Sequence, residues 1–129
     1  MLNFLGIPLL FGPVQSKSRV FDLKARLDWG EPALTIIDVR DHADFYFSHI
    51  AGAISMPITE PVDRVLASLE YDRDIYLYGT TDEETAAAAR QLRTLGYRNV
   101  SELRGGVAAW KAVGYPIERA CAPVSLIRG

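Results

Sequence analysis

The sequence has little of what several kinds of site require: one cysteine, two histidines and no excess of positive charge. The single cysteine, Cys121, excludes an internal disulfide and a cysteine-cluster metal site, and it fits a reducing compartment such as the cytoplasm. Fourteen Lys and Arg residues against sixteen Asp and Glu residues give a net charge of −2. We therefore expect no basic surface for nucleic acid.

A long hydrophobic run is also absent. The first sixteen residues carry no charged side chain, but two glycines and two prolines interrupt them before they reach the ~20 apolar residues that span a bilayer. They also lack the features of a secretory signal. Three interpretations of this apolar extension, residues 1–17, stay open: packing on the domain, docking to a partner, and resting on a membrane interface. The opposite end, residues 119–129, forms a C-terminal tail, of which residues 120–127 carry no charged side chain.

Between these ends, residues 18–118 are the size of one domain with one core. Branched and apolar residues predict buried strands at 34–39, 74–78 and 99–103, a short strand at 53–56 and an edge strand at 20–21. Helix signals alternate with these strands. Short strands separated by helices predict crossover connections, and hence an α/β fold with a mostly parallel sheet covered by helices on both faces.

The helices are predicted from caps and apolar stripes. The Thr81-x-x-Glu84 pattern predicts a capping box, in which each side chain accepts a hydrogen bond from the other residue's backbone, and the helix ends at Gly96. Asp41 is expected to cap a short helix. Further helices are predicted to carry Leu23 and Leu27, to follow Thr59-Glu60-Pro61 with Leu66 and Leu69 on one stripe, and to follow Gly105-Gly106 with Val107 and Trp110.

Several short motifs are spread along the chain in a characteristic order. They are Ile37-Asp38-Val39-Arg40, Ser48-His49-Ile50-Ala51-Gly52-Ala53-Ile54, Leu95-Gly96-Tyr97, Leu103-Arg104-Gly105-Gly106-Val107-Ala108-Ala109-Trp110 and Gly114-Tyr115-Pro116-Ile117. In this order and spacing they resemble the rhodanese homology domain of the sulfurtransferase family over roughly residues 18–118. The resemblance implies a compact α/β domain with a central parallel sheet of about five strands.

The resemblance also implies where chemistry would take place. In active relatives, a cysteine at the end of the fourth strand opens a loop of the form Cys-Arg-x-Gly-x-Arg that leads into a helix. A thiolate there, beside backbone N–H groups and arginines, attacks a sulfane sulfur and holds it as a persulfide. In this sequence Gly79 stands at the cysteine position, Thr80 replaces the first arginine and Glu84 replaces the last. We therefore expect a variant without the catalytic nucleophile.

The charge of this active-site-like loop is reversed as well. The loop consists of Gly79, Thr80, Thr81, Asp82, Glu83, Glu84 and Thr85. Its three carboxylates disfavour an anionic donor such as thiosulfate. They also suit the N-terminus of a helix, and recognition of a cation or a basic partner segment stays open as the alternative. The threonines have no adjacent base in the loop and are poor nucleophiles.

Other polar residues of the motifs are expected to support the loop. Asp38, Arg40 and His49 brace loops beside the active-site position in the family, and Asp38 at a strand end can accept backbone or histidine hydrogen bonds. The histidines His42 and His49 with Asp38 and Asp44 fit no metal-ligand spacing, so we expect no metal and no cofactor. Outside the loop, Cys121 is the one candidate sulfur carrier, although no glycine-rich loop precedes it.

The sequence thus favours a non-catalytic rhodanese-like module with a binding or regulatory role. One alternative is a sulfurtransferase that uses Cys121 or a partner's cysteine as persulfide carrier. Another is a membrane-peripheral or assembly adaptor that docks through the apolar N-terminus. A protein partner and a homo-oligomer stay open, whereas nucleic acid and a membrane span are not expected.

Overall fold

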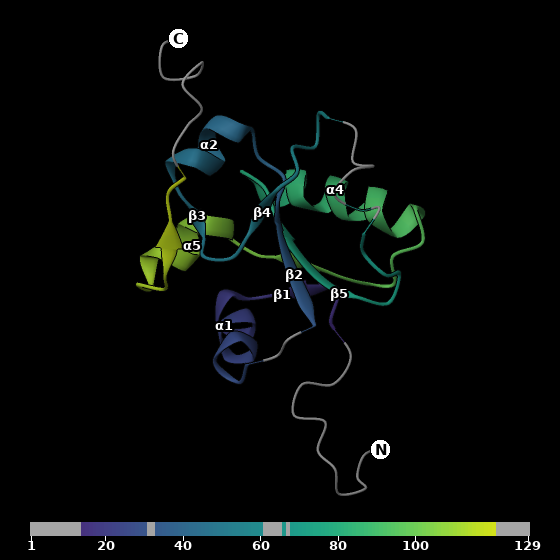
Figure 1. The fold of residues 1–129 in the computed structure, drawn as a ribbon, viewed down its shortest axis with the longest axis horizontal. Helices are drawn as coiled ribbons and strands as arrows, with labels where there is room; N and C mark the ends of the chain where they lie inside the picture. Colours follow the sequence, from purple (N-terminus) through teal and green to yellow (C-terminus); the bar gives the residue numbers. More distant parts are fainter. Residues whose placement is uncertain (1–13, 31–32, 61–65, 67, 121–129) are drawn as a thin grey trace, which may run out of the picture.

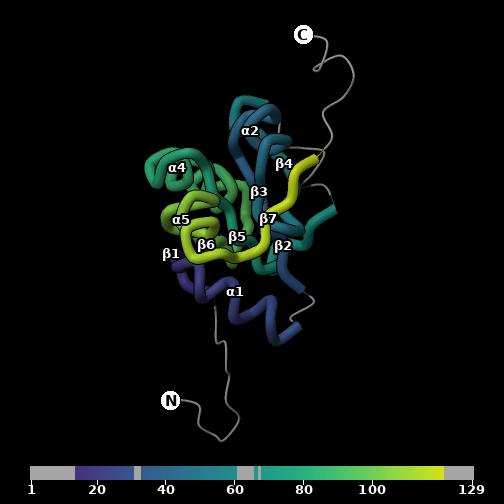
Figure 2. The backbone as a smooth tube through the Cα atoms, turned by 90° about the vertical axis from the view of Figure 1, so that its left-hand side faces the viewer, coloured from purple at the N-terminus to yellow at the C-terminus, as the bar shows by residue number. Residues whose placement is uncertain are grey.

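A computed structural model describes residues 14–30, 33–60, 66 and 68–120 of the chain. Its centre is a five-stranded, all-parallel sheet with the strand order β1-β6-β5-β2-β4 (Figure 1). The strands are β1 (Lys17–Ser18), β2 (Leu34–Asp38), β4 (Ile54–Ser55), β5 (Asp74–Tyr78) and β6 (Asn99–Leu103). The α/β prediction with a parallel sheet is confirmed. In addition, β3 (His49–Ile50) and β7 (Ile117–Glu118) lie side by side as an antiparallel pair (Figure 2).

Four helices connect these strands within the described residues. They are α1 (Val20–Asp28), α2 (His42–Phe47), α4 (Asp82–Thr94) and α5 (Gly106–Ala112). None of them is long and apolar enough to span a bilayer. Most of the helix predicted after Thr59-Glu60-Pro61 lies outside the described residues, but Leu66 and Leu69 pack against the core.

The predicted edge strand at residues 20–21 is wrong, because Val20 begins helix α1. The edge strand is β1, directly before it, which pairs with β6. The three-residue spacing of Val20 and Leu23 buries both on one helical face and leaves Phe21 48% exposed. The N–H of Arg19 donates to the Asp22 carboxylate at 2.8 Å, which fixes the helix start.

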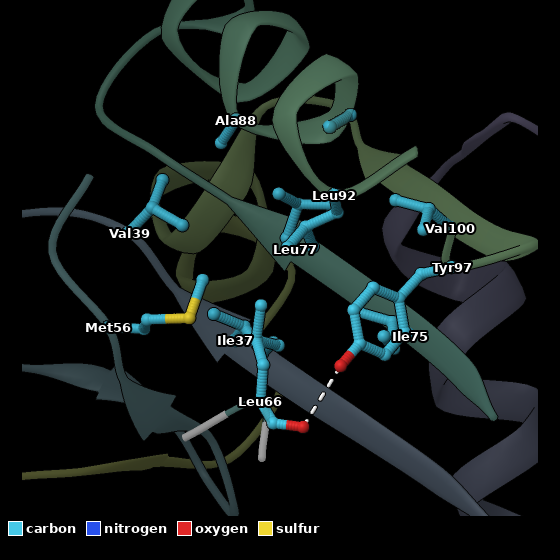
Figure 3. Packing of buried hydrophobic residues seen from close by; sticks show 11 residues of the cluster. Ile37, Val39, Met56, Leu66, Ile75, Leu77, Ala88, Leu92, Tyr97 and Val100 are labelled. Carbon is cyan, nitrogen blue, oxygen red and sulfur yellow. Dashed lines mark hydrogen bonds between the residues drawn. The ribbon is translucent and has the colours of Figure 1, made fainter. Parts of the chain in front are cut away.

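Side chains alternate between the two faces of β2 and β5, and each set packs against different helices. On one face, Ile37, Ile75 and Leu77 pack with Ala88 and Leu92 of α4 (Figure 3). On the other face, the cluster contains Ile36, Tyr76, Tyr78, Leu23 of α1, Phe45 of α2 and Trp110 of α5. Helices therefore cover both faces of the sheet, as predicted.

The parallel strands all end at one edge, where their carboxyl ends bring several loops together. The register pairs Asp38 at the end of β2 with Tyr78 on β5 and with Ser55 on β4. Asp38 therefore lies between the residue that precedes Gly79 and the last residue of β4. Open parallel sheets bind ligands at this edge, and the candidate site therefore lies there.

Candidate functional site

The loop from Gly79 to Thr85 leaves the end of β5 and enters α4 (Figure 1). Thr81 is the N-cap, and its hydroxyl accepts a hydrogen bond from the N–H of Glu84 at 3.1 Å, which confirms one half of the predicted capping box. The other half is wrong: the Glu84 carboxylate accepts from the N–H of Thr80 at 2.6 Å. The bond is shifted by one residue because the chain turns after β5 and presents the N–H of Thr80 to the first helical turn.

The Glu84 side chain also occupies the space beside Gly79. A Cβ atom built on Gly79 would lie 2.5 Å from Oε1 and 3.1 Å from Cγ of Glu84. A Cβ on Gly106, whose φ is +55°, would lie 3.1 Å from the Gly79 carbonyl oxygen. The backbone of Gly79 is thus enclosed between the first turn of α4 and the start of α5, and the position has no room for a larger side chain while Glu84 holds this geometry.

The hydroxyl of Thr85 bonds to two backbone groups of the loop. The N–H of Gly79 donates to the hydroxyl of Thr85 at 2.8 Å, and that hydroxyl donates to the Thr81 carbonyl at 3.0 Å. Thr85 is buried. Its hydroxyl therefore serves as a link within the loop, and the N–H groups of Gly79 and Thr80 both have partners from the chain itself.

Asp82 links the start of α4 to the loop after β6. Its carboxylate accepts from the N–H of Gly105 at 3.0 Å and from Nε of Arg104 at 3.1 Å. The hydrogen bond from Gly105, followed by that from Arg104, lowers the pKa of Asp82 below its ordinary value. Two of the three loop carboxylates, Asp82 and Glu84, are thus engaged by the domain's own donors, while Glu83 is exposed.

A cavity of about 170 Å³ lies beside the start of α4. It is lined by Lys17, Asp82, Glu83, Thr85, Ala86, Glu102 and Arg104. Its walls combine two cationic and three acidic side chains, so it has no strong preference for an anion. Gly79 and Thr80 do not line it.

Asp38, one of the predicted supporting residues, forms a buried ion pair with Arg40. Its carboxylate accepts from the backbone N–H of Arg40 at 2.9 Å and from Nη2 of the guanidinium at 2.7 Å. The predicted backbone hydrogen bond is present, and the side-chain donor is an arginine and not a histidine. The same Nη2 donates to the Ser48 carbonyl at 2.6 Å, so the pair ties β2 to the segment between α2 and β3.

Tyr78, the residue that precedes Gly79, contacts both this ion pair and β3. Its ring lies under the Arg40 guanidinium at 5.6 Å, and its hydroxyl accepts from the N–H of Ile50 at 3.1 Å. Burial, together with the negative charge of Asp38, raises the pKa of Tyr78. Tyr78 therefore stays neutral and acts as a hydrogen-bond acceptor that fixes β3 against β5.

The predicted supporting residue His49 has partners other than Asp38 and Arg40. Its Nδ1 donates to the Phe45 carbonyl at 2.7 Å, and its ring stacks on Phe45 with centroids 3.7 Å apart. Its Nε2 lies 3.4 Å from the Glu118 carboxylate of β7. His49 is buried and links α2, β3 and β7.

The second histidine has partners that the sequence analysis missed. Nδ1 of His42 lies 2.9 Å from the Ser55 hydroxyl, and Nε2 lies 3.3 Å from the Glu60 carboxylate. No local pattern marks this cluster, since its members are brought together by the pairing of β4 with β2. Among the described residues, the His, Asp and Glu side chains form no group of three able to hold a metal ion. Cys121, the candidate sulfur carrier, lies outside the described residues.

A parallel sheet whose central strand ends in a loop at a helix N-terminus defines a class of α/β domains that bind or transfer groups at this edge. Within that class, the model of the family described as "Rhodanese-like domain" matches residues 20–113. The match spans more than half of the chain, and the chain belongs to this family.

Known relatives agree with this assignment. A crystal structure of the Alr3790 protein from Anabaena sp. has 51% sequence identity and a TM-score of 0.78, and the match covers 86% of this chain and 87% of that one. The HTH-type transcriptional regulator Rv0324 of Mycobacterium tuberculosis is 40% identical over 105 residues, which cover 80% of this chain and 44% of the regulator.

A further relative is the probable adenylyltransferase/sulfurtransferase MoeZ of Mycobacterium tuberculosis. It is 34% identical over 90 residues, which cover 69% of this chain and 23% of that protein. This chain therefore spans less than half the length of either of these two relatives.

Proposed function

We propose that this chain is a non-catalytic rhodanese-like module with a binding or regulatory role in the cytoplasm. The observation that carries the proposal is the position of Glu84, whose carboxylate lies beside Gly79 and accepts the N–H of Thr80. Sulfur transfer needs a side chain that holds the sulfur and a cradle that receives the anionic donor. Glycine supplies no such side chain, and Glu84 occupies the cradle.

Electrostatics supports the same conclusion. Two unit charges of like sign ~4 Å apart at an effective dielectric constant near 20 repel by about 4 kcal/mol, an upper-range figure for a site at the surface. Glu84 lies in the loop itself, and the exposed Glu83 adds a second negative charge nearby. Thiosulfate would therefore meet repulsion where active relatives have arginine.

A regulatory role is supported by the kind of protein in which a similar domain occurs. A relative with 40% identity is named as an HTH-type transcriptional regulator, and this chain matches less than half of it. A rhodanese-like domain in such a protein need not perform turnover, because a domain can bind and regulate without catalysis.

The second candidate function is a sulfurtransferase in which Cys121 or a partner's cysteine carries the sulfur. The name of MoeZ, a probable adenylyltransferase/sulfurtransferase, favours this candidate. It differs from the first in a measurable way, because it requires a thiol outside the loop from Gly79 to Thr85.

The experiment that separates the two is thiocyanate formation from thiosulfate and cyanide by the full chain and by Cys121→Ser. We expect no thiocyanate above a protein-free blank from either protein, with an active rhodanese assayed in parallel. Turnover that disappears in Cys121→Ser would establish the second candidate. Turnover that persists in Cys121→Ser would contradict both the proposal and a role for Cys121.

A further inference from the structure

The imidazole of His42 lies between a hydroxyl and a carboxylate. His42 begins α2, Ser55 ends β4, and Glu60 follows five residues later. Nδ1 of His42 lies 2.9 Å from Oγ of Ser55, and Nε2 lies 3.3 Å from each oxygen of the Glu60 carboxylate. A hydroxyl, an imidazole and a carboxylate in this order of contacts are the groups that activate a nucleophile in acyl transfer, with the two ring nitrogens exchanged relative to the Ser-His-Asp triad.

The partners of the ring assign its tautomer. A carboxylate only accepts hydrogen bonds, so the contact with Glu60 places the imidazole proton on Nε2. When the ring is neutral, Nδ1 carries a lone pair, and the Ser55 hydroxyl donates the hydrogen bond between them. In the neutral ring, a base is therefore already in contact with the proton that a nucleophilic serine would lose.

The ring is held in this orientation and is accessible from solvent. Tyr46 stacks on His42 with a centroid distance of 6.1 Å and an interplanar angle of 20°. The His42 side chain is 42% exposed, and Ser55 is half-buried at the end of the edge strand β4. The side chain of His42 and the residue Ser55 are therefore both partly exposed to solvent.

We propose that Ser55 is an acyl-acceptor nucleophile, with His42 as its general base and Glu60 as a positioning residue that fixes the tautomer of His42. The substrate class is small activated esters. Their good leaving groups allow acyl transfer without strong stabilisation of the oxyanion that develops at the carbonyl oxygen. This activity goes beyond the proposed binding role, and it uses none of the residues from Gly79 to Thr85.

The step balances without a cofactor. Oγ of Ser55 forms a bond to the acyl carbon while its proton moves to Nδ1 of His42. The bond between the acyl carbon and the leaving oxygen breaks, and that oxygen takes the proton from His42. The products are acyl-Ser55, the alcohol or phenol of the ester and neutral His42, and nothing is oxidised or reduced.

The test uses the full chain with p-nitrophenyl acetate, followed by intact mass and peptide mapping of the acetylated residue. We expect one acetyl group on Ser55, its loss in Ser55→Ala, and an unchanged rate in the control Ser68→Ala, which replaces an exposed serine elsewhere. Acetyl groups confined to lysines or to His42, or spread over several serines, would overturn the proposal.

The role of His42 is tested in His42→Ala. We expect Ser55 acetylation to slow by at least ~100-fold, since general-base catalysis contributes about 10²–10⁴-fold, and we expect added imidazole to restore part of the rate. A structural role for the ring would give no such rescue. An unchanged rate in a folded His42→Ala chain would overturn the assignment of the base.

Glu60 is tested by two substitutions, because Glu60→Gln keeps an acceptor for Nε2 and Glu60→Ala removes it. We expect the rate to fall further in Glu60→Ala than in Glu60→Gln, with equal thermal unfolding midpoints. Equal rates in both variants and in the wild type would remove Glu60 from the proposal.

Discussion

Two loops at the same edge of the sheet differ in what they leave accessible. After β5, the N–H groups of Gly79 and Thr80 are bonded to Thr85 and Glu84, and a side chain fills the space beside the glycine. After β2 and β4, a half-exposed histidine faces the hydroxyl of Ser55. The fold brings both loops to one edge, but the side chains decide which of them is closed to a ligand.

The largest effect on stability is expected at the Asp38–Arg40 ion pair, which lies close to His42 in the chain. Asp38→Ala leaves Arg40 buried without its carboxylate, and breaking a buried pair from one side costs about 3–5 kcal/mol. We expect a loss of this size in the free energy of unfolding measured with urea. Glu118→Ala, which removes a more exposed carboxylate near His49, serves as the control and should cost much less. A loss below ~1 kcal/mol in Asp38→Ala would show that the pair does not anchor this edge.

A smaller effect is expected in the closed loop, where Gly79 and Glu84 should be coupled. Gly79→Ala places a Cβ against Oε1 of Glu84 and displaces it from Thr80, which should cost about 1–2 kcal/mol. Glu84→Ala loses the same hydrogen bond, so the double variant should be less destabilised than the sum of the two, by about 1 kcal/mol. Unfolding of the four proteins in urea measures this coupling, and strict additivity would mean that the carboxylate does not lie beside Gly79.

The N-cap of α4 should contribute to the free energy of unfolding independently of the contact between Glu84 and Thr80. Thr81→Ala removes the acceptor for the N–H of Glu84, and we expect a loss of about 1 kcal/mol in the free energy of unfolding. Thr81→Ser keeps the hydroxyl and should retain most of the stability. If the serine and alanine variants unfold at the same denaturant concentration, the hydroxyl is not the capping group.

The smallest effect is expected at Asp82, and it depends on pH. The pKa of Asp82 is lower in the folded chain than its ordinary value of 3.8. Its contribution is therefore fully present above that value and is lost as the pH falls through the folded pKa. Because the side chain is 44% exposed, solvent screening keeps this contribution below ~1 kcal/mol.

Asp82→Asn tests this directly, because an amide cannot titrate. We expect the variant to be slightly less stable than the wild type at neutral pH and the difference to disappear in acid, as measured by urea unfolding at a series of pH values. A difference that grows as the pH falls would contradict a lowered pKa of Asp82 in the folded chain.

The sheet was predictable because its buried strands are short runs of mainly apolar and branched residues. Residues 34–38 and 74–78 have that pattern. The alternation of strands with helices also indicated parallel pairing, because it requires crossover connections. Strand β1 was missed because Lys17 and Ser18 carry no apolar signal and are defined only by their backbone pairing with β6. The apolar pair that follows them belongs to a helix.

The site was predictable only where its contacts are local. An acid three residues after the N-cap of α4 indicated a capping role for Glu84, but the path of the loop decides that its partner is Thr80. Ser55 and Glu60 lie 13 and 18 residues from His42. Their meeting depends on the register between β4 and β2, which no local pattern encodes.

Closure of the loop after β5 to anions by Glu84 can be measured by backbone amide NMR of the chain titrated with thiosulfate. We expect the amide signals of residues 79–85 not to move at millimolar thiosulfate. In Glu84→Ala, the freed N–H of Thr80 makes its signal the one most sensitive to the anion. Saturable movement of the Gly79 and Thr80 signals in the wild-type chain would show that the loop binds the anion despite Glu84.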